Sequence, residues 1–135
     1  MNRLIATAAV VLLLGGCATI GITHERGGFA NVSPTVANEM ILDTPQIVVF
    51  DFRPSDEYTA AHIAGAISTP IDQIDVQLPL LIPYRSGTVL VYGDSRDDSE
   101  RGARVLVAAG FRNVVRIDGG LGGWIAKGYQ TVSSE

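Results

Sequence analysis

Apolar residues recur from residue 32 onward in two alternating patterns. Short runs rich in β-branched residues, typical of buried strands, alternate with segments in which apolar residues recur every three or four positions, as on one face of a helix. The strand-like segments are 46–52, 64–67, 88–92 and 114–117, and the helix-like segments are 34–42, a short one from 54, 71–82, 100–109 and a short final one after 119–124. This alternation predicts an α/β domain with a mostly parallel sheet.

Residue choices at helix ends support this assignment. Pro34, preceded by a serine, is typical of the first position of a helix. Gly110 is expected to end the helix over 100–109, and either Asp98 or Ser99 is expected to cap its start.

The first 17 residues have the layout of a bacterial export signal. Arg3 precedes an apolar run over 4–14, which ends in Leu14-Gly15-Gly16-Cys17. This run is shorter than the roughly 20 apolar residues that a transmembrane helix needs. Its end resembles the lipobox of bacterial lipoproteins, in which the cysteine is acylated and becomes the new N-terminus. A buried N-terminal helix with a free thiol, a simple cleaved signal and an uncleaved anchor are the alternatives.

The expected organisation has three parts. Residues 1–16 form the signal peptide, 17–31 the lipidated N-terminus and tether, and 32–132 the folded domain. A cysteine with two or three acyl chains, palmitate among them, binds stably to a membrane, so we expect the membrane as a partner through Cys17. By resemblance to lipoprotein sorting, Ala18 implies the outer membrane, facing the periplasm.

Composition and charge narrow the function further. Fourteen acidic and ten basic side chains give a net charge of -4 without any basic block, which argues against nucleic-acid binding. Cys17 is the single cysteine, and only His24 and His62 could add further soft ligands, so neither an internal disulfide nor a common zinc cluster is expected. No metal or cofactor site is predicted.

Several short motifs occur in an order and spacing that indicate one family. They are 49–53, 57–58, 62–66, 110–114, 119–120, Trp124 and 127–129. Through them, the segment 32–132 resembles a single-domain rhodanese. The resemblance implies a three-layer domain with a central, mostly parallel five-stranded sheet flanked by helices. The resemblance also implies that the following residues belong to structural motifs of the family: Asp51, Arg53, His62, Gly65, Gly119, Gly120 and Trp124.

The position of the family's nucleophile differs in this chain. Rhodaneses transfer a sulfane sulfur from a donor such as thiosulfate through a persulfide on a cysteine, which follows the strand expected here at 88–92. Gly93 occupies that position, and its spacing to Gly110 fits the family without a gap. Backbone N–H groups at a helix N-terminus can lower a thiol pKa and hold a persulfide, but glycine offers no sulfur. We therefore predict no catalytic residue.

The loop after this strand is the candidate ligand-binding segment. It comprises Gly93, Asp94, Ser95, Arg96, Asp97, Asp98 and Ser99. With Glu100 and Arg101 included, the local charge is -2, which disfavours an anionic sulfur donor. The acids are interpreted first as helix-capping and solvated groups, with a role in binding a ligand or partner and a divalent cation as alternatives.

Other polar and aromatic candidates are interpreted as structural or surface groups. Asp51 and Arg53 could form a substrate clamp and His62 could sense pH, but a structural role is the simpler interpretation for each. Trp124 is expected to pack across the final helix. The arginines interpreted as surface charges are Arg104, Arg112 and Arg116, with Arg112 the candidate for meeting acidic partners.

These observations favour a lipid-anchored, non-catalytic binding or assembly module with an envelope protein as partner. One alternative is an enzyme of unrecognised chemistry that uses Asp94, Ser95 or Asp98 in the pocket that holds the persulfide in rhodaneses. Another is a structural envelope protein held only by its lipid.

Overall fold

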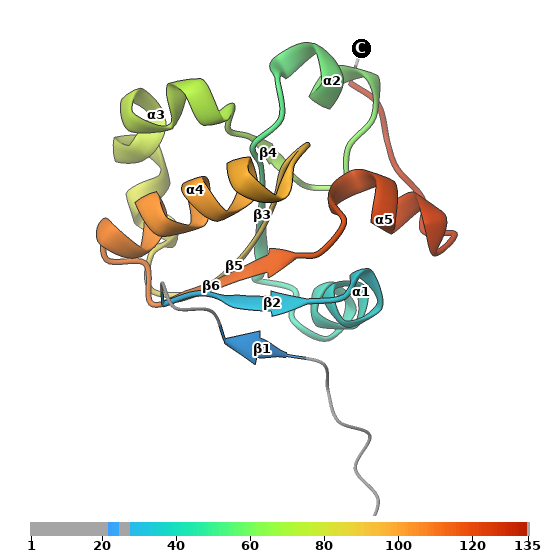
Figure 1. The fold of residues 1–135 in the computed structure, drawn as a ribbon, viewed down its shortest axis with the longest axis horizontal. Helices are drawn as coiled ribbons and strands as arrows, with labels where there is room; N and C mark the ends of the chain where they lie inside the picture. Colours follow the sequence, from blue (N-terminus) through green and yellow to red (C-terminus); the bar gives the residue numbers. More distant parts are fainter. Residues whose placement is uncertain (1–21, 25–27, 135) are drawn as a thin grey trace, which may run out of the picture.

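A six-stranded sheet forms the centre of the computed structural model, which describes residues 22–24 and 28–134 (Figure 1). Its strands are β1 (Thr23–His24), β2 (Ala30–Val32), β3 (Val48–Asp51), β4 (Ile67–Ser68), β5 (Thr88–Tyr92) and β6 (Asn113–Ile117). They are arranged in the order β1-β2-β6-β5-β3-β4, and β1 alone pairs antiparallel with its neighbour. The expected five-stranded parallel sheet is therefore confirmed, with β1 added at one edge.

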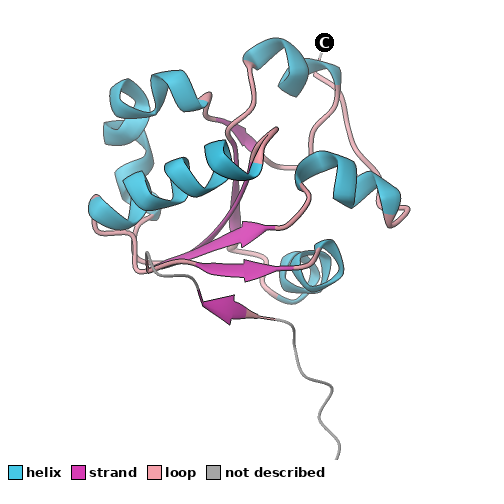
Figure 2. Cartoon of the chain, viewed as in Figure 1, coloured by secondary structure: helices cyan, strands magenta, loops and turns pink. Residues whose placement is uncertain are grey.

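Helices cover both faces of this sheet, giving three layers (Figure 2). They are α1 (Pro34–Asp43), α2 (Ser55–Ala60), α3 (Ile74–Leu81), α4 (Arg96–Ala108) and α5 (Gly120–Ala126), with 3-10 turns η1 (Ile71–Gln73) and η2 (Ile82–Tyr84). The expected helix over 71–82 is thus divided into three pieces, and Pro79 lies inside α3.

The central strand β5 shows how the two halves of the core arise. Successive strand side chains point to opposite faces, so Leu90 and Tyr92 enter the cluster under α1 and α5. Val89 and Val91 enter the cluster under α3 and α4. All four side chains are fully buried, as expected for a parallel sheet covered on both faces.

Gly102 allows α4 to pack tightly on the sheet. A Cβ atom at this position would lie 2.4 Å from the ring of Phe52, the residue after β3. The small residue in the middle of the helix therefore brings α4 close to the carboxyl end of β3, where the connection to α2 begins.

The N-terminal boundary of the domain differs from the expectation. Phe29 is 1% exposed, and β2 begins at Ala30, although both lie in the segment 17–31 assigned to the tether. A strand of three residues is too short to give a recognisable hydrophobic pattern. The expected strand over 64–67 is also displaced: Gly65 adopts a φ of 81° in a turn, and pairing starts at Ile67.

The predicted signal peptide, 1–16, and Cys17 lie outside the described residues. In the part that is described, no helix has both the length and the apolar character needed to cross a membrane.

Candidate functional site

A pocket of about 230 Å³ opens at the carboxyl ends of β5 and β6, where α4 and α5 begin. It is lined by Gly93, Asp94, Ser95, Arg96, Ser99, Arg116, Asp118, Gly119 and Gly120. Parallel sheets commonly bind ligands beyond the carboxyl ends of their strands. Five of the seven residues of the candidate loop contribute to the lining, whereas Asp97 and Asp98 do not.

Two glycines form the junction of β5 and α5 at this pocket. Gly120 has a φ of 57°, and a Cβ atom there would lie 2.4 Å from the carbonyl oxygen of Gly93. At Gly93 itself, a Cβ atom would lie 3.4 Å from the backbone nitrogen of Ser99, an ordinary contact. The pocket therefore has room for a side chain at 93, although the sequence places none there.

The helix that borders the pocket starts earlier than expected. α4 begins at Arg96, and Ser95 is its N-cap, with the Ser95 hydroxyl oxygen accepting a hydrogen bond from the Asp98 N–H at 3.0 Å. The predicted caps, Asp98 and Ser99, are wrong because both residues lie inside the first turn. The spacing Ser95-x-x-Asp98 is itself a capping-box-like signal that could have located this start.

Charges around the pocket are balanced, in contrast to the acidic loop inferred from the sequence. The lining holds the carboxylates of Asp94 and Asp118 and the guanidinium groups of Arg96 and Arg116. Arg96 also donates a 2.6 Å hydrogen bond to Glu100, which lowers the pKa of that carboxyl. The excess negative charge therefore lies on the outer side of α4 and not in the pocket.

Arg116 is a buried residue of the site, and its assignment to the surface is wrong. Its side chain is 3% exposed. It donates to the Asn31 Oδ1 atom at 2.6 Å and the Ser99 hydroxyl at 3.5 Å, and it forms a short ion pair with Asp118. Because Asn31 lies on β2 and Ser99 on α4, this guanidinium joins the sheet to the helix at the base of the pocket.

Asp94, which lines the pocket, forms a carboxyl pair with a residue outside the lining. Glu57 of α2 forms a side-chain hydrogen bond with Asp94, and this bond is the main cause of the raised pKa of Glu57. Two carboxyl groups can share a hydrogen bond only when one of them carries a proton, so the contact favours the protonated form of Glu57. The contact connects α2 to the loop after β5.

Asp51 and Arg53 form a buried network with Tyr92. The Arg53 side chain donates to both oxygens of Asp51, and the Tyr92 hydroxyl donates to Asp51 Oδ2 at 2.5 Å. The same hydroxyl accepts a hydrogen bond from the Ile63 N–H at 3.2 Å. Burial raises the pKa of Tyr92, and the hydrogen bond to Asp51 adds to this shift. The network ties β3 and β5 to the segment before β4.

His62 lies outside the pocket and makes local contacts. It is 5% exposed, its ring stacks on Tyr58 with centroids 3.8 Å apart, and its Nδ1 atom lies 2.7 Å from the Tyr58 carbonyl oxygen. The backbone of His62 also pairs with Val132 near the C-terminus. These contacts hold the end of the chain against the turn after α2.

Trp124 packs inside the domain, also away from the pocket. Its side chain is 4% exposed, belongs to the core under α5, and lies with its ring centroid 4.9 Å from that of Tyr129. Its indole N–H donates to the Gln130 carbonyl oxygen at 3.0 Å. Gly119, by contrast, lines the pocket with a φ of 77°, just before α5.

The divalent-cation alternative has no support in the described part of the chain. There, no group of three or more His, Cys, Asp or Glu side chains is arranged so that it could hold a metal ion.

The sequence matches the family model of the rhodanese-like domain over residues 33–127. The chain belongs to the rhodanese-like family. This membership accounts for the parallel sheet and for the position of the pocket at the end of β5.

The curated relatives include tRNA uridine(34) hydroxylases. That of Hamiltonella defensa subsp. Acyrthosiphon pisum (strain 5AT) is 31% identical over 88 residues, which is 62% of this chain and 24% of the relative. That of Pectobacterium carotovorum subsp. carotovorum (strain PC1) is 28% identical over 108 residues, 75% of this chain and 30% of the relative. The chain thus spans about a quarter of the length of these relatives.

Solved structures with the same fold include other rhodanese-like domains. The rhodanese-like domain of an Anabaena sp. protein has a TM-score of 0.69 at 28% identity, with coverage of 76% of this chain and 78% of that one. A rhodanese-related protein from Thermoplasma volcanium has a TM-score of 0.67 at 24% identity, covering 76% of this chain and 96% of that one. The thiosulfate sulfurtransferase of Pseudomonas aeruginosa shares the fold with a TM-score of 0.67 at 23% identity, covering 77% of this chain and 20% of that one.

Proposed function

We propose that this protein is a lipid-anchored rhodanese-like domain that does not transfer sulfur and serves as a binding or assembly module in the bacterial cell envelope. The observation that carries the proposal is Gly93. Gly93 directly follows β5 and lines the pocket, at the position where the family resemblance places the cysteine that carries the persulfide. Persulfide chemistry needs a thiolate, and Cys17, the single cysteine, lies outside the domain.

The hydroxyl groups of the pocket do not form an activated nucleophile. The Ser95 hydroxyl accepts the capping hydrogen bond of α4. The Ser99 hydroxyl donates to the carbonyl oxygens of Ser95 and Arg96 at 3.1 and 2.9 Å. A serine nucleophile needs a neighbouring base, but His62 does not line the pocket and its Nδ1 atom lies 2.7 Å from the Tyr58 carbonyl oxygen. These contacts argue against an unrecognised enzyme that uses Ser95, and Asp98 does not line the pocket.

The balanced charge of the pocket supports binding of a polar group more than capture of a free anion. Arg116 is already neutralised by Asp118, and the carboxyl group of Asp94 stands at the rim. A group with both donors and acceptors, such as a peptide backbone or an amide side chain, would satisfy such a lining.

The chain that leads from the proposed anchor joins the domain at the end of the sheet where the pocket opens. Thr23 pairs with Asn31 in antiparallel register, so Ile22 lies at the end of the sheet where β2 has its carboxyl end. Ile22 is five positions after Cys17 in the sequence, a span of at most about 18 Å for an extended chain. A lipid at Cys17 would therefore keep the pocket end near the membrane, which we propose to be the outer membrane on its periplasmic side.

The names of the relatives do not transfer directly. The hydroxylases extend well beyond the part matched by this chain. We propose that this chain shares only their rhodanese-like scaffold and not the hydroxylation of tRNA, in keeping with its acidic charge.

Cross-linking in intact cells tests the binding role. The double variant Asp94→Ala/Arg96→Ala removes one negative and one positive charge from the pocket lining. The matched control Asp97→Ala/Lys127→Ala removes the same charges outside it. We expect the pocket variant to lose the captured partner and the control to keep it. Capture of the same partner by both variants would contradict the pocket as the binding site.

Labelling with a palmitate analogue tests the anchor. The full chain should incorporate the label and sediment with membranes, whereas Cys17→Ser should do neither. An unlabelled chain that is released into the periplasm would show that the anchor is wrong, and would leave the binding role to be tested separately by the cross-linking experiment.

A further inference from the structure

A second cavity, of about 650 Å³, opens at the other end of the sheet from the Gly93 pocket. It is lined by Ile82, Pro83, Arg85, Ser86, Gly110 and Arg112. Arg85 precedes β5 and Arg112 precedes β6, so the cavity lies at the amino ends of these strands. We call it the arginine cavity.

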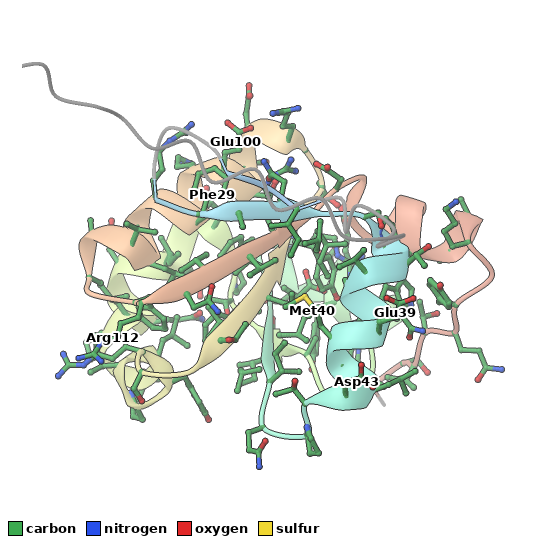
Figure 3. All side chains as sticks on the ribbon, turned by 90° about the horizontal axis from the view of Figure 1, so that it is seen from below. Phe29, Glu39, Met40, Asp43, Glu100 and Arg112 are labelled. Atoms are coloured by element: carbon green, nitrogen blue, oxygen red, sulfur yellow. The ribbon has the colours of Figure 1, made fainter. Side chains whose placement is uncertain are left out.

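Backbone pairing fixes the two arginines beside each other. The Arg112 N–H donates to the Arg85 carbonyl oxygen at 3.1 Å. Just beyond, Thr88 and Asn113 are register partners, and the Asn113 amide donates to the Thr88 hydroxyl at 2.7 Å. Both arginines are exposed, and Figure 3 shows the Arg112 side chain reaching out from the edge of the domain. Two guanidinium groups therefore extend from neighbouring, rigidly held backbone positions.

Among the described residues, these two arginines are, with Lys127, the cations that form no ion pair with a carboxylate. Residues 22–24 and 28–134 contain eight Lys or Arg side chains. Five of them form ion pairs with carboxylates: Arg53, Arg96, Arg101, Arg104 and Arg116. Of the three that do not, Lys127 follows α5, and the other two share the arginine cavity.

The cavity is also a site of positive charge on an acidic protein. Within the described residues, no Asp or Glu lines it. Neighbouring guanidinium groups repel each other, and a carboxylate can relieve the repulsion while accepting two parallel hydrogen bonds from each planar fork. The wall formed by Ile82 and Pro83 adds an apolar surface beside the charges.

We infer that the arginine cavity binds a carboxylate-rich peptide segment of a partner protein. Its volume lies in the range of sites that hold several side chains, and it combines two cations with an apolar wall. A segment with two acidic side chains in sequence could meet both arginines at once. Its neighbouring residues could then contact Ile82 and Pro83.

The location of the cavity fits a partner in the periplasm. It lies at the opposite end of the sheet from Ile22, where the chain leads toward Cys17. This orientation rests on the proposed lipid anchor, whereas the charge and shape of the cavity do not. Binding of the peptide can therefore be tested whether or not the anchor exists.

Fluorescence anisotropy with a labelled hexaglutamate peptide tests the inference on the full chain in neutral detergent micelles. We expect saturable binding that weakens as salt is raised, because exposed charges are screened, and none to hexaglutamine. Arg85→Gln and Arg112→Gln should each weaken binding about tenfold, or about 1.4 kcal/mol. The matched control Lys127→Gln removes another unpaired cation and should change the affinity less than about twofold.

Two further variants keep the result interpretable. Arg85→Lys/Arg112→Lys retains the charge but not the bidentate fork, and should bind with intermediate affinity. Unfolding midpoints should show that all variants remain folded, because both arginines are exposed. The inference is overturned if Arg85→Gln/Arg112→Gln binds hexaglutamate as tightly as the parent chain. It is also overturned if only citrate, inorganic phosphate or anionic lipid vesicles bind and the peptide does not.

Discussion

Gly120 touches the backbone of Gly93 so closely that no side chain fits between them. A Cβ atom at 120 would lie 2.4 Å from the carbonyl oxygen of Gly93. The contact seats the start of α5 on the end of β5 and closes one side of the pocket. The junction of β5 and α5 is thus a contact between backbone atoms, and position 93, where a side chain would fit, carries none.

The contact predicts that alanine lowers the stability of the domain at position 120 of α5 but not at position 122. Gly120→Ala combines a clash with an unfavourable positive φ and should lower the free energy of unfolding by about 2 kcal/mol or more. Gly122→Ala, two residues along, meets nothing within 4 Å and should be neutral or stabilising. Urea unfolding monitored by circular dichroism compares them. Equal midpoints for the two variants would contradict the close approach of Gly120 to Gly93.

The Tyr92 hydroxyl predicts a loss of stability at alkaline pH. The folded state keeps the Tyr92 pKa above its ordinary value of 10.0, so the unfolded chain releases this proton first. The contribution is complete below pH 10 and decreases as pH rises toward the folded pKa, by up to about 1.4 kcal/mol per pH unit. Unfolding of the parent chain and of Tyr92→Phe should therefore be compared from pH 9 to 11.5. Curves with the same slope above pH 10 would rule out this linkage.

The buried position of Arg116 predicts that it stabilises the domain. Arg116→Met removes the hydrogen bonds to Asn31 and Ser99, and should lower the free energy of unfolding by about 1 to 3 kcal/mol. Arg101, whose side chain is 58% exposed and whose ion pairs are 3.5 and 3.6 Å long, is the matched control. Arg101→Met should change stability by less than about 1 kcal/mol. Thermal and urea unfolding would both register the difference.

Restoring a cysteine should restore little activity. Gly93→Cys fits sterically, because its Cβ would make ordinary contacts with Ser99. Both arginines of the lining are already paired, Arg96 with Glu100 and Arg116 with Asp118. The new thiol would therefore share the pocket with the carboxylates of Asp94 and Asp118 without a free cation, which disfavours both the thiolate and an anionic donor. One such like-charge contact costs about 1 kcal/mol even in water, roughly fivefold in affinity. Thiosulfate-dependent turnover should rise when Asp94→Asn is added. Efficient turnover from the single change would show that these carboxylates do not limit sulfur transfer.

The sequence predicted most of the scaffold because its signals are local. The β-branched run over Thr88–Tyr92 coincides with β5, and Ser33 followed by Pro34 locates the start of α1. β2 was missed because its pairing with Ile117 spans 85 residues of sequence and its own pattern is three residues long. Short strands at an edge depend on a partner that local patterns do not reveal.

The pocket could be predicted only in part, for a related reason. Gly93 was located by the spacing of motifs along the chain, but the charge of the lining depends on which side chains turn inward. Arg116 was assigned to the surface because nothing in its own segment indicates Asn31, its register partner on β2. Ser95 was overlooked as a cap because Asp98 and Ser99 are equally suitable residue types.

We propose that a rhodanese-like pocket with Gly93 at the position of the family's cysteine does not carry sulfur. The most direct measurement is transfer from thiosulfate to cyanide by the full chain in detergent, beside an active single-domain rhodanese, with the intact mass recorded after exposure to thiosulfate. We expect no turnover above the protein-free reaction and no added sulfur atom. Saturable turnover, or a persulfide on the chain, would contradict it.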